Sequence, residues 1–188
     1  MANHQNNTAL LVMDMQNIIV SIYAKQEGDL LPFQRAVEAA RRQNIPVIFM
    51  GVAVREGVQI SPRNKMFGKT TGNSGKTAPG TLMQIHDSVQ PQSGEPVVDK
   101  FRVSAFSGSD LETLLHARGI DTLVLSGIAT SGVVLSTLCE AADKDFAITV
   151  LSDACLDADP EVHRVLTEKV FPRHADVLTV DAWIETLE

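Results

Sequence analysis

Six short apolar runs, each rich in β-branched residues, constrain the fold of this chain more than any other feature. They cover residues 9–13, 47–52, 97–98, 122–125, 148–151 and 177–180. Runs of this length without polar alternation are typical of strands buried on both faces of a sheet. Helical patterns lie between most of them. The alternation predicts an α/β fold, with three α/β/α layers around a doubly wound, mostly parallel six-stranded sheet.

Four helices are expected between these strands. Residues 31–42 repeat apolar side chains at helical spacing, and a second helix should begin at an N-cap, Ser109, and stop at Gly119. A third should cover residues 130–144. Asp159 should cap a fourth, which has a proline in its first turn.

Length and charge bound the class of protein. The chain has 188 residues, 44% of them hydrophobic, which predicts one globular domain over residues 1–188. A net charge of -7 without any Lys/Arg-rich run argues against nucleic acid and favours a small-molecule substrate. The apolar runs are too short to span a bilayer, and residues 1–8 lack the apolar core of a signal peptide, so we expect a cytoplasmic protein that does not bind membranes.

Cysteine and histidine usage predicts neither a metal nor a cofactor. Cys139 and Cys155 show no metal-ligand spacing, and the five histidines are scattered. We expect both thiols to be buried.

One long stretch, residues 55–94, is dense in Gly, Pro, Ser, Thr and Asn and shows little periodicity. It is either a mobile excursion or a functional loop. In the second case residues 61–67 would wall a ligand pocket, Phe67 would contact the substrate, and the basic residues of this segment would favour an anionic substrate.

Three polar segments follow expected strands. Asp14 ends the first run, Lys100 follows the third, and residues 127–137 follow the fourth. The carboxyl ends of parallel strands share one edge of the sheet, where ligands bind. These segments read Asp-Met-Gln-Asn, Lys-Phe-Arg-Val-Ser-Ala-Phe and Gly-Ile-Ala-Thr-Ser-Gly-Val-Val. In this order they resemble the signature segments of the isochorismatase-like (cysteine hydrolase) superfamily, and the resemblance spans nearly the whole chain.

The resemblance implies a catalytic site. In cysteine hydrolases of the superfamily a first-strand aspartate takes the proton of a thiol, a lysine orients the pair, and the cysteine attacks a carbonyl. Asp14 and Lys100 match the first two positions, whereas Val133 occupies the position of the nucleophile. Valine cannot attack a carbonyl, so covalent catalysis would need another residue. The resemblance also implies a cis peptide bond between Ile128 and Ala129.

Substitute nucleophiles exist in the sequence, but each has a simpler interpretation. Ser131 lies beside the nucleophile position and is expected to form hydrogen bonds at the start of a helix. Ser136 is expected to be a buried packing residue. Cys139 should turn away from the face of Val133, because six helical residues separate the two.

A second branch of the superfamily, the isochorismatases, cleaves a vinyl ether without cysteine, through acid catalysis by the first-strand aspartate and attack by water. That chemistry needs a carboxylic acid that keeps its proton near neutral pH. An apolar wall at Val133 would raise the pKa of Asp14 by desolvation, whereas a nearby Lys100 would lower it. The sequence leaves the balance open.

The sequence also nominates residues that contact the substrate. Gln16 either does so or satisfies loop backbone, and Arg102 either binds a carboxylate through its planar fork or forms an intersubunit salt bridge. The others are Ser104, Ala129 and Thr130.

The preferred hypothesis is a hydrolase that uses Asp14 and water on a small, possibly anionic metabolite. The alternatives are an inactive member that binds a metabolite or serves assembly, and an amidase with a substitute nucleophile. A homo-oligomer, a dimer or larger, is expected from the resemblance and from apolar residues on a late helix, Val162, Val165 and Leu166.

Overall fold

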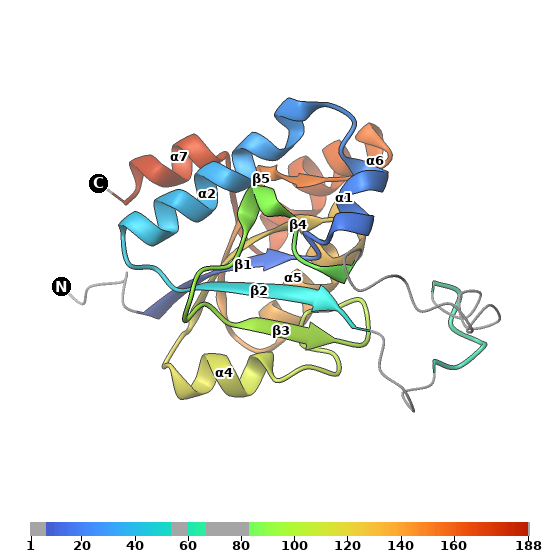
Figure 1. Ribbon diagram of the computed structural model, residues 1–188, viewed down its shortest axis with the longest axis horizontal. Coiled ribbons are helices and arrows are strands. Elements are labelled where there is room, and N and C mark those ends of the chain that lie inside the picture. The colour runs from blue at the N-terminus through green and yellow to red at the C-terminus, as the bar shows by residue number, and fades with distance from the viewer. Residues whose placement is uncertain (1–6, 54–59, 67–82, 188) are drawn as a thin grey trace.

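The computed structural model describes residues 7–53, 60–66 and 83–187 (Figure 1). Its centre is a six-stranded sheet made of β1 (Thr8–Met13), β2 (Val47–Val52), β3 (Val97–Lys100), β4 (Thr122–Ile128), β5 (Ala147–Leu156) and β6 (Asp176–Leu178). The strand order is β3-β2-β1-β4-β5-β6, and every pair is parallel. This order is that of a doubly wound sheet whose connections reverse direction between β1 and β4. The predicted fold class is confirmed.

Helices cover both faces of the sheet (Figure 1). One face carries α1 (Asn17–Tyr23), α2 (Leu31–Arg42) and α7 (Val180–Glu185). The other face carries α4 (Leu111–Ala117), α5 (Leu135–Asp143) and the wide turn Leu166–Val170 that continues α6 (Pro160–Val165). Short 3-10 turns occur at Glu27–Leu30, Asp87–Val89 and Phe171–Arg173.

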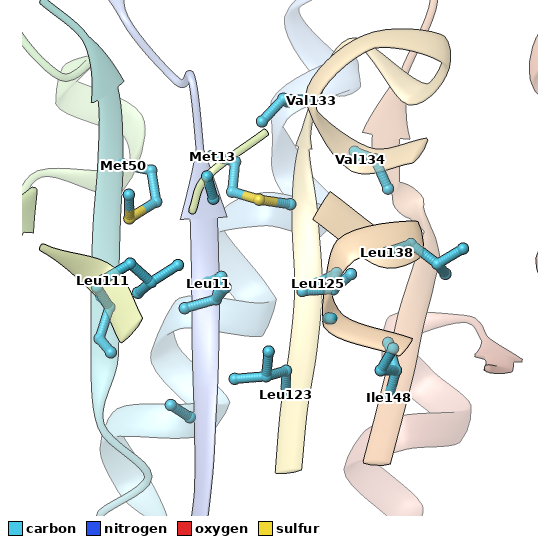
Figure 2. Close-up of a cluster of buried hydrophobic side chains, with 14 of the residues drawn as sticks. Leu11, Met13, Met50, Leu111, Leu123, Leu125, Val133, Val134, Leu138 and Ile148 are labelled. Atoms are coloured by element: carbon cyan, nitrogen blue, oxygen red, sulfur yellow. The ribbon is translucent and has the colours of Figure 1, made fainter. Parts of the chain in front are cut away.

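Strand β1 is buried on both sides, so each face of the sheet has its own apolar core. Leu11 and Met13 face α4 and α5, whereas Leu10 and Val12 face α2. Figure 2 shows the first of these cores, with Leu111 beside β2, Leu138 beside β5, and Leu11 and Leu125 between them. Burying one such side chain contributes roughly 1.5–3 kcal/mol, so these two cores hold the sheet edge in a fixed geometry.

Strands β1 and β4 approach unusually closely at their carboxyl ends. Gly127 pairs with Met13 in the register of the two strands. A Cβ atom at position 127 would lie 2.5 Å from the carbonyl oxygen of Met13 and 2.8 Å from its Cβ. Only glycine permits this approach, which brings the residues that follow the two strands side by side.

Several predicted helix signals are confirmed. Helix α2 covers the predicted residues 31–42. Gly119 follows α4 with a left-handed backbone (φ 63°), and the Asp159 side chain accepts hydrogen bonds from the N–H groups of Glu161 and Val162 at the start of α6. These signals worked because each is local to the helix end.

Strands β4 and β5 run beyond the expected residues 122–125 and 148–151, to Ile128 and Leu156, and three further boundaries were predicted wrongly. The helix expected over residues 130–144 is interrupted at Gly132 (φ -101°, ψ -105°), so Thr130–Val134 forms a wide π turn, and α5 begins at Leu135. The N-cap of α4 is Asp110, one residue after Ser109.

The third error concerns the last strand, expected over residues 177–180. Strand β6 ends at Leu178, because the Thr179 hydroxyl accepts a hydrogen bond from the N–H of Ala182 and starts α7 there.

Within the described ranges, no helix combines the length and the apolarity that crossing a bilayer requires.

Candidate active site

Asp14 lies at the carboxyl end of β1, in the centre of the sheet. Its backbone is left-handed (φ 58°), a conformation that aspartate and asparagine tolerate better than most residues. Its N–H donates a hydrogen bond to the carbonyl oxygen of Met50 at 2.9 Å, which extends the pairing with β2 by one residue. The residue is 5% exposed, so its carboxyl group lies within the protein.

Lys100 ends β3 and reaches across β2 to Asp14. Its side chain is 1% exposed, and Nζ lies 2.9 Å from Asp14 Oδ2. Nζ also donates to the carbonyl oxygens of Arg102 at 2.9 Å and Val103 at 3.0 Å. Three acceptors thus match the three N–H bonds of the ammonium group. The predicted contact between Asp14 and Lys100 is present in the structure, and the lysine is locked in one orientation.

The Asp14 carboxyl is the one buried group in the described residues with an unpartnered side-chain oxygen. Oδ2 pairs with Lys100, whereas Oδ1 has no hydrogen-bond partner among the residues that the structure describes. Burial raises the pKa of Asp14 to about 6, although the charge and the hydrogen bond of Lys100 lower it. Of the two opposing effects that the sequence left open, desolvation is the larger. The site therefore contains a carboxyl that can hold or release a proton near neutral pH.

The turn after β4 passes next to Asp14. Gly127 pairs with Met13 at the ends of the two strands, so the residues that follow each strand start side by side. The bond between Ile128 and Ala129 is cis, as predicted. Val133 is 2% exposed and belongs to the apolar cluster that includes Met13; Figure 2 shows it above the end of β1.

Neither cysteine occupies the nucleophile position, where this chain has Val133. Cys155 is buried, and desolvation raises the pKa of its thiol to about 12, so the thiol stays protonated at neutral pH. The prediction that Cys139 is buried was wrong. Helix α5 packs through Thr137, Leu138 and Ala141, and Cys139 lies on its exposed side.

Gln16 is buried at the start of α1, and its amide is engaged by backbone. Nε2 donates to the carbonyl oxygens of Val52 at 3.1 Å and Met83 at 2.6 Å, while Oε1 accepts from the N–H of Val52 at 2.9 Å. Of the two alternatives from the sequence, the structure shows the backbone contact. Gln16 ties the end of β2 to the chain around residue 83.

Two of the other nominated residues follow Lys100. Arg102 is half-buried and donates to the carbonyl oxygen of Phe101 at 2.7 Å. Ser104 is buried, and its hydroxyl accepts from the N–H of Phe106 at 3.2 Å. Both lie on the segment that supplies carbonyl acceptors to Lys100, and their contact with a substrate stays a prediction.

The loop expected to wall the pocket is described only in part. Phe67 lies outside the described residues. Met66 has its Cε 3.9 Å from the point where a Cβ would lie on Gly132, so residues 60–66 reach the turn beside the site.

The turn also contacts two residues that the sequence reasoning missed. Ser131 is exposed, and its N–H donates to Asp157 Oδ2 at 2.7 Å. Thr130 is fully buried, and its Oγ1 lies 2.8 Å from Nδ1 of His163. Asp157 and His163 carry no motif or spacing, and only the three-dimensional fold brings them to the turn.

In the part of the chain that the structure describes, no group of three or more His, Cys, Asp or Glu side chains could hold a metal ion.

Comparison with known proteins gives a consistent result. The isochorismatase domain model matches residues 8–182. The ureidoacrylate amidohydrolase RutB of Acinetobacter baylyi is 34% identical over 181 residues, which cover 84% of this chain and 74% of that protein. A probable inactive nicotinamidase of Arabidopsis thaliana is 32% identical over 174 residues, 87% of each protein. The structure of an isochorismatase family protein from Desulfovibrio vulgaris has a TM-score of 0.85 and 26% identity, with 97% of this chain and 98% of that one covered.

Proposed function

The chain belongs to the isochorismatase family, a family that includes amidohydrolases, and on this premise we propose that it hydrolyses a small metabolite by means of Asp14 and water. The observation that carries the proposal is the buried, unpartnered Oδ1 of a carboxyl whose pKa is about 6. No covalent intermediate on cysteine is involved.

Lys100 makes the two carboxyl oxygens of Asp14 inequivalent. Because Oδ2 is held by the ammonium group, Oδ1 is the oxygen left for the substrate or for water. The three acceptors around Nζ fix the lysine, so the Asp14 carboxyl is oriented before any substrate arrives. The Val133 side chain contributes an apolar surface in place of a thiol.

The reaction that this site supports best is cleavage of a vinyl ether. Protonated Asp14 donates its proton to the terminal vinyl carbon, which leaves an oxocarbenium ion. Water adds to the cationic carbon and loses a proton to the Asp14 carboxylate. The resulting hemiketal breaks the C–O bond to the leaving oxygen, which receives the proton of the hemiketal hydroxyl, so the products are a carbonyl compound and an alcohol. Asp14 ends the cycle protonated, so it acts as acid and then base.

Amide hydrolysis is the second candidate, and the name of the relative RutB favours it. Here ionised Asp14 takes a proton from water as the water oxygen attacks the carbonyl carbon. The tetrahedral intermediate then breaks its C–N bond while Asp14 returns the proton to the leaving nitrogen. Use of Ser131 as a nucleophile has less support, because Ser131 is exposed and its side chain pairs with Asp157, not with the buried Asp14–Lys100 pair.

An anionic substrate is part of the proposal. Arg63 and Lys65 are exposed on the segment that ends at Met66, and Met66 reaches Gly132 in the turn beside the site. Two cations here would attract a carboxylate-bearing substrate toward the site.

The experiment is a panel of vinyl ethers, carbamoyl amides and esters assayed with the pure protein before and after alkylation by iodoacetamide. Turnover should be unchanged by alkylation, because exposed Cys139 lies outside the site and buried Cys155 stays protonated. Loss of turnover on alkylation would refute the water mechanism. If the protein binds compounds of the panel but turns over none of them, the inactive alternative is supported. The name of the Arabidopsis relative, a probable inactive nicotinamidase, points to the same alternative.

The pH dependence of kcat/KM distinguishes vinyl-ether cleavage from amide hydrolysis, because the two reactions lose activity in opposite directions from pH 6. The pKa of Asp14 is about 6, so the acid form dominates below pH 6 and the carboxylate above it. For vinyl-ether cleavage kcat/KM should be constant below pH 6 and fall about tenfold per unit above it, whereas base-catalysed amide hydrolysis should fall below pH 6. Circular dichroism over the same range controls for unfolding. A profile flat from pH 5 to 8 would exclude Asp14 from both roles.

A further inference from the structure

Two side chains outside the Asp14–Lys100 pair hold the turn between β4 and α5. Asp157, which follows β5, accepts the N–H of Ser131 at 2.7 Å. His163, on α6, lies 2.8 Å from the hydroxyl oxygen of Thr130. The two contacts hold the consecutive residues Thr130 and Ser131, one from α6 and the other from the residue that follows β5.

This turn needs support from outside because it is not a regular helix. Gly132 has non-helical dihedral angles, and Thr130–Val134 forms a single wide turn before α5 begins. Such a turn places its side chains less rigidly than a regular helix does, unless tertiary contacts fix it. Val133, the wall of the site, is the next residue after this irregularity.

We propose that Asp157 and His163 are positioning residues, which hold the turn 129–133 in register with Asp14 and so fix where Val133 and the turn backbone meet the substrate. The inference rests on the proposed function only in taking this turn as a wall of the substrate site. Neither residue contacts the Asp14–Lys100 pair in the hydrogen bonds of the structure.

The charge of Asp157 suits this role. Burial alone would raise the pKa of Asp157, but hydrogen bonds from the Ser131 side chain and backbone, and from the backbone at Asp159 and Ala158, together lower it. A carboxylate that stays ionised makes a stronger hydrogen bond to a backbone N–H than a neutral acceptor does.

The test uses a thiol at position 133 as a reporter that needs no substrate. In a Cys139→Ser background, Val133→Cys provides one thiol next to the Asp14–Lys100 pair, while burial raises the pKa of the remaining thiol, Cys155, to about 12 and keeps it protonated. Its alkylation rate by iodoacetamide, measured from pH 5 to 10, gives the pKa and the reactivity of that thiol. Adding Asp157→Asn is expected to raise the pKa of this thiol and so to slow alkylation at pH 7 at least about tenfold, because a displaced turn carries the thiol away from the Lys100 ammonium group that favours the thiolate.

The direction of the change distinguishes positioning from simple electrostatics. Removal of a negative charge near a thiol favours the thiolate and speeds alkylation, so Asp157→Asn without any movement of the turn would raise the rate. Glu161→Gln is the matched control: it makes the same acid-to-amide change on exposed α6, where Glu161 pairs only with Arg164 among the described residues, and it should leave the rate unchanged. An unchanged or faster rate in Asp157→Asn would overturn the proposal.

A second measurement tests the proposal even if the Val133→Cys variant does not fold. Hydrogen exchange of residues 129–135, in protein that keeps Val133, should be at least about tenfold faster in Asp157→Asn and in His163→Leu, with β1 unaffected. Unaltered exchange in both would refute the positioning role. If the protein turns over no substrate, but Asp157→Asn slows alkylation and speeds hydrogen exchange as expected, the proposed function is refuted and the positioning role is supported.

Discussion

Replacing Asp14 with asparagine is expected to lower kcat/KM for any true substrate by at least about 100-fold, because general acid–base catalysis typically contributes 10²–10⁴-fold. Asparagine has the size of aspartate and tolerates the left-handed backbone at this position (φ 58°), so the fold should be retained. The variant loses the transferable proton and also the charge that pairs with buried Lys100, so circular dichroism must accompany the kinetics to show that the fold is retained. Steady-state kinetics on the best substrate of the panel measure the effect.

Asp145→Asn is the matched control for this variant. Asp145 also has a left-handed backbone (φ 63°), but it is exposed at the turn before β5. The same chemical change there should leave kcat/KM within about twofold of the unmodified protein, as expected for a surface substitution. Full activity in Asp14→Asn would remove Asp14 from the mechanism.

The second large effect is expected on stability. Lys100→Met should lower the free energy of unfolding by about 3–5 kcal/mol, because removing one partner of a buried ion pair leaves the other uncompensated. The variant also leaves the carbonyl oxygens of Arg102 and Val103 without their donor. Urea denaturation, followed by circular dichroism, measures the change.

Lys144→Met tests whether burial is the cause. Lys144 Nζ lies 2.8 Å from Glu112 Oε2, a distance similar to that of the Lys100–Asp14 pair, but the Glu112 side chain is 60% exposed. Solvent screens this pair, so its loss should change the unfolding midpoint far less. Equal effects of the two substitutions would contradict a buried, coupled pair at Lys100.

Much of the fold was predictable because its signals are local. Runs such as residues 47–52 are uniformly apolar, and a central parallel strand requires this of every position. The contact between Asp14 and Lys100 was predictable as well, since both follow strands whose ends share one edge of the sheet.

What the sequence did not reveal depends on contacts between distant segments. Gly132 alone does not predict a π turn, since the break depends on how the turn packs between β4 and α6. Asp157 and His163 are 26 and 33 residues away from their partners in the chain. Cys139 was misplaced because α5 packs through Thr137, Leu138 and Ala141, and position 139 lies off that stripe.

The close approach at Gly127 bears on how variation in this family should be interpreted. Every substitution there adds a Cβ, and a Cβ would fall 2.5 Å from the Met13 carbonyl oxygen. Selection for folding alone would therefore keep glycine at this position, next to the active-site edge, in proteins of any activity or none. A glycine retained here among relatives would be evidence of shared architecture, and it should carry no weight in deciding which of them are enzymes.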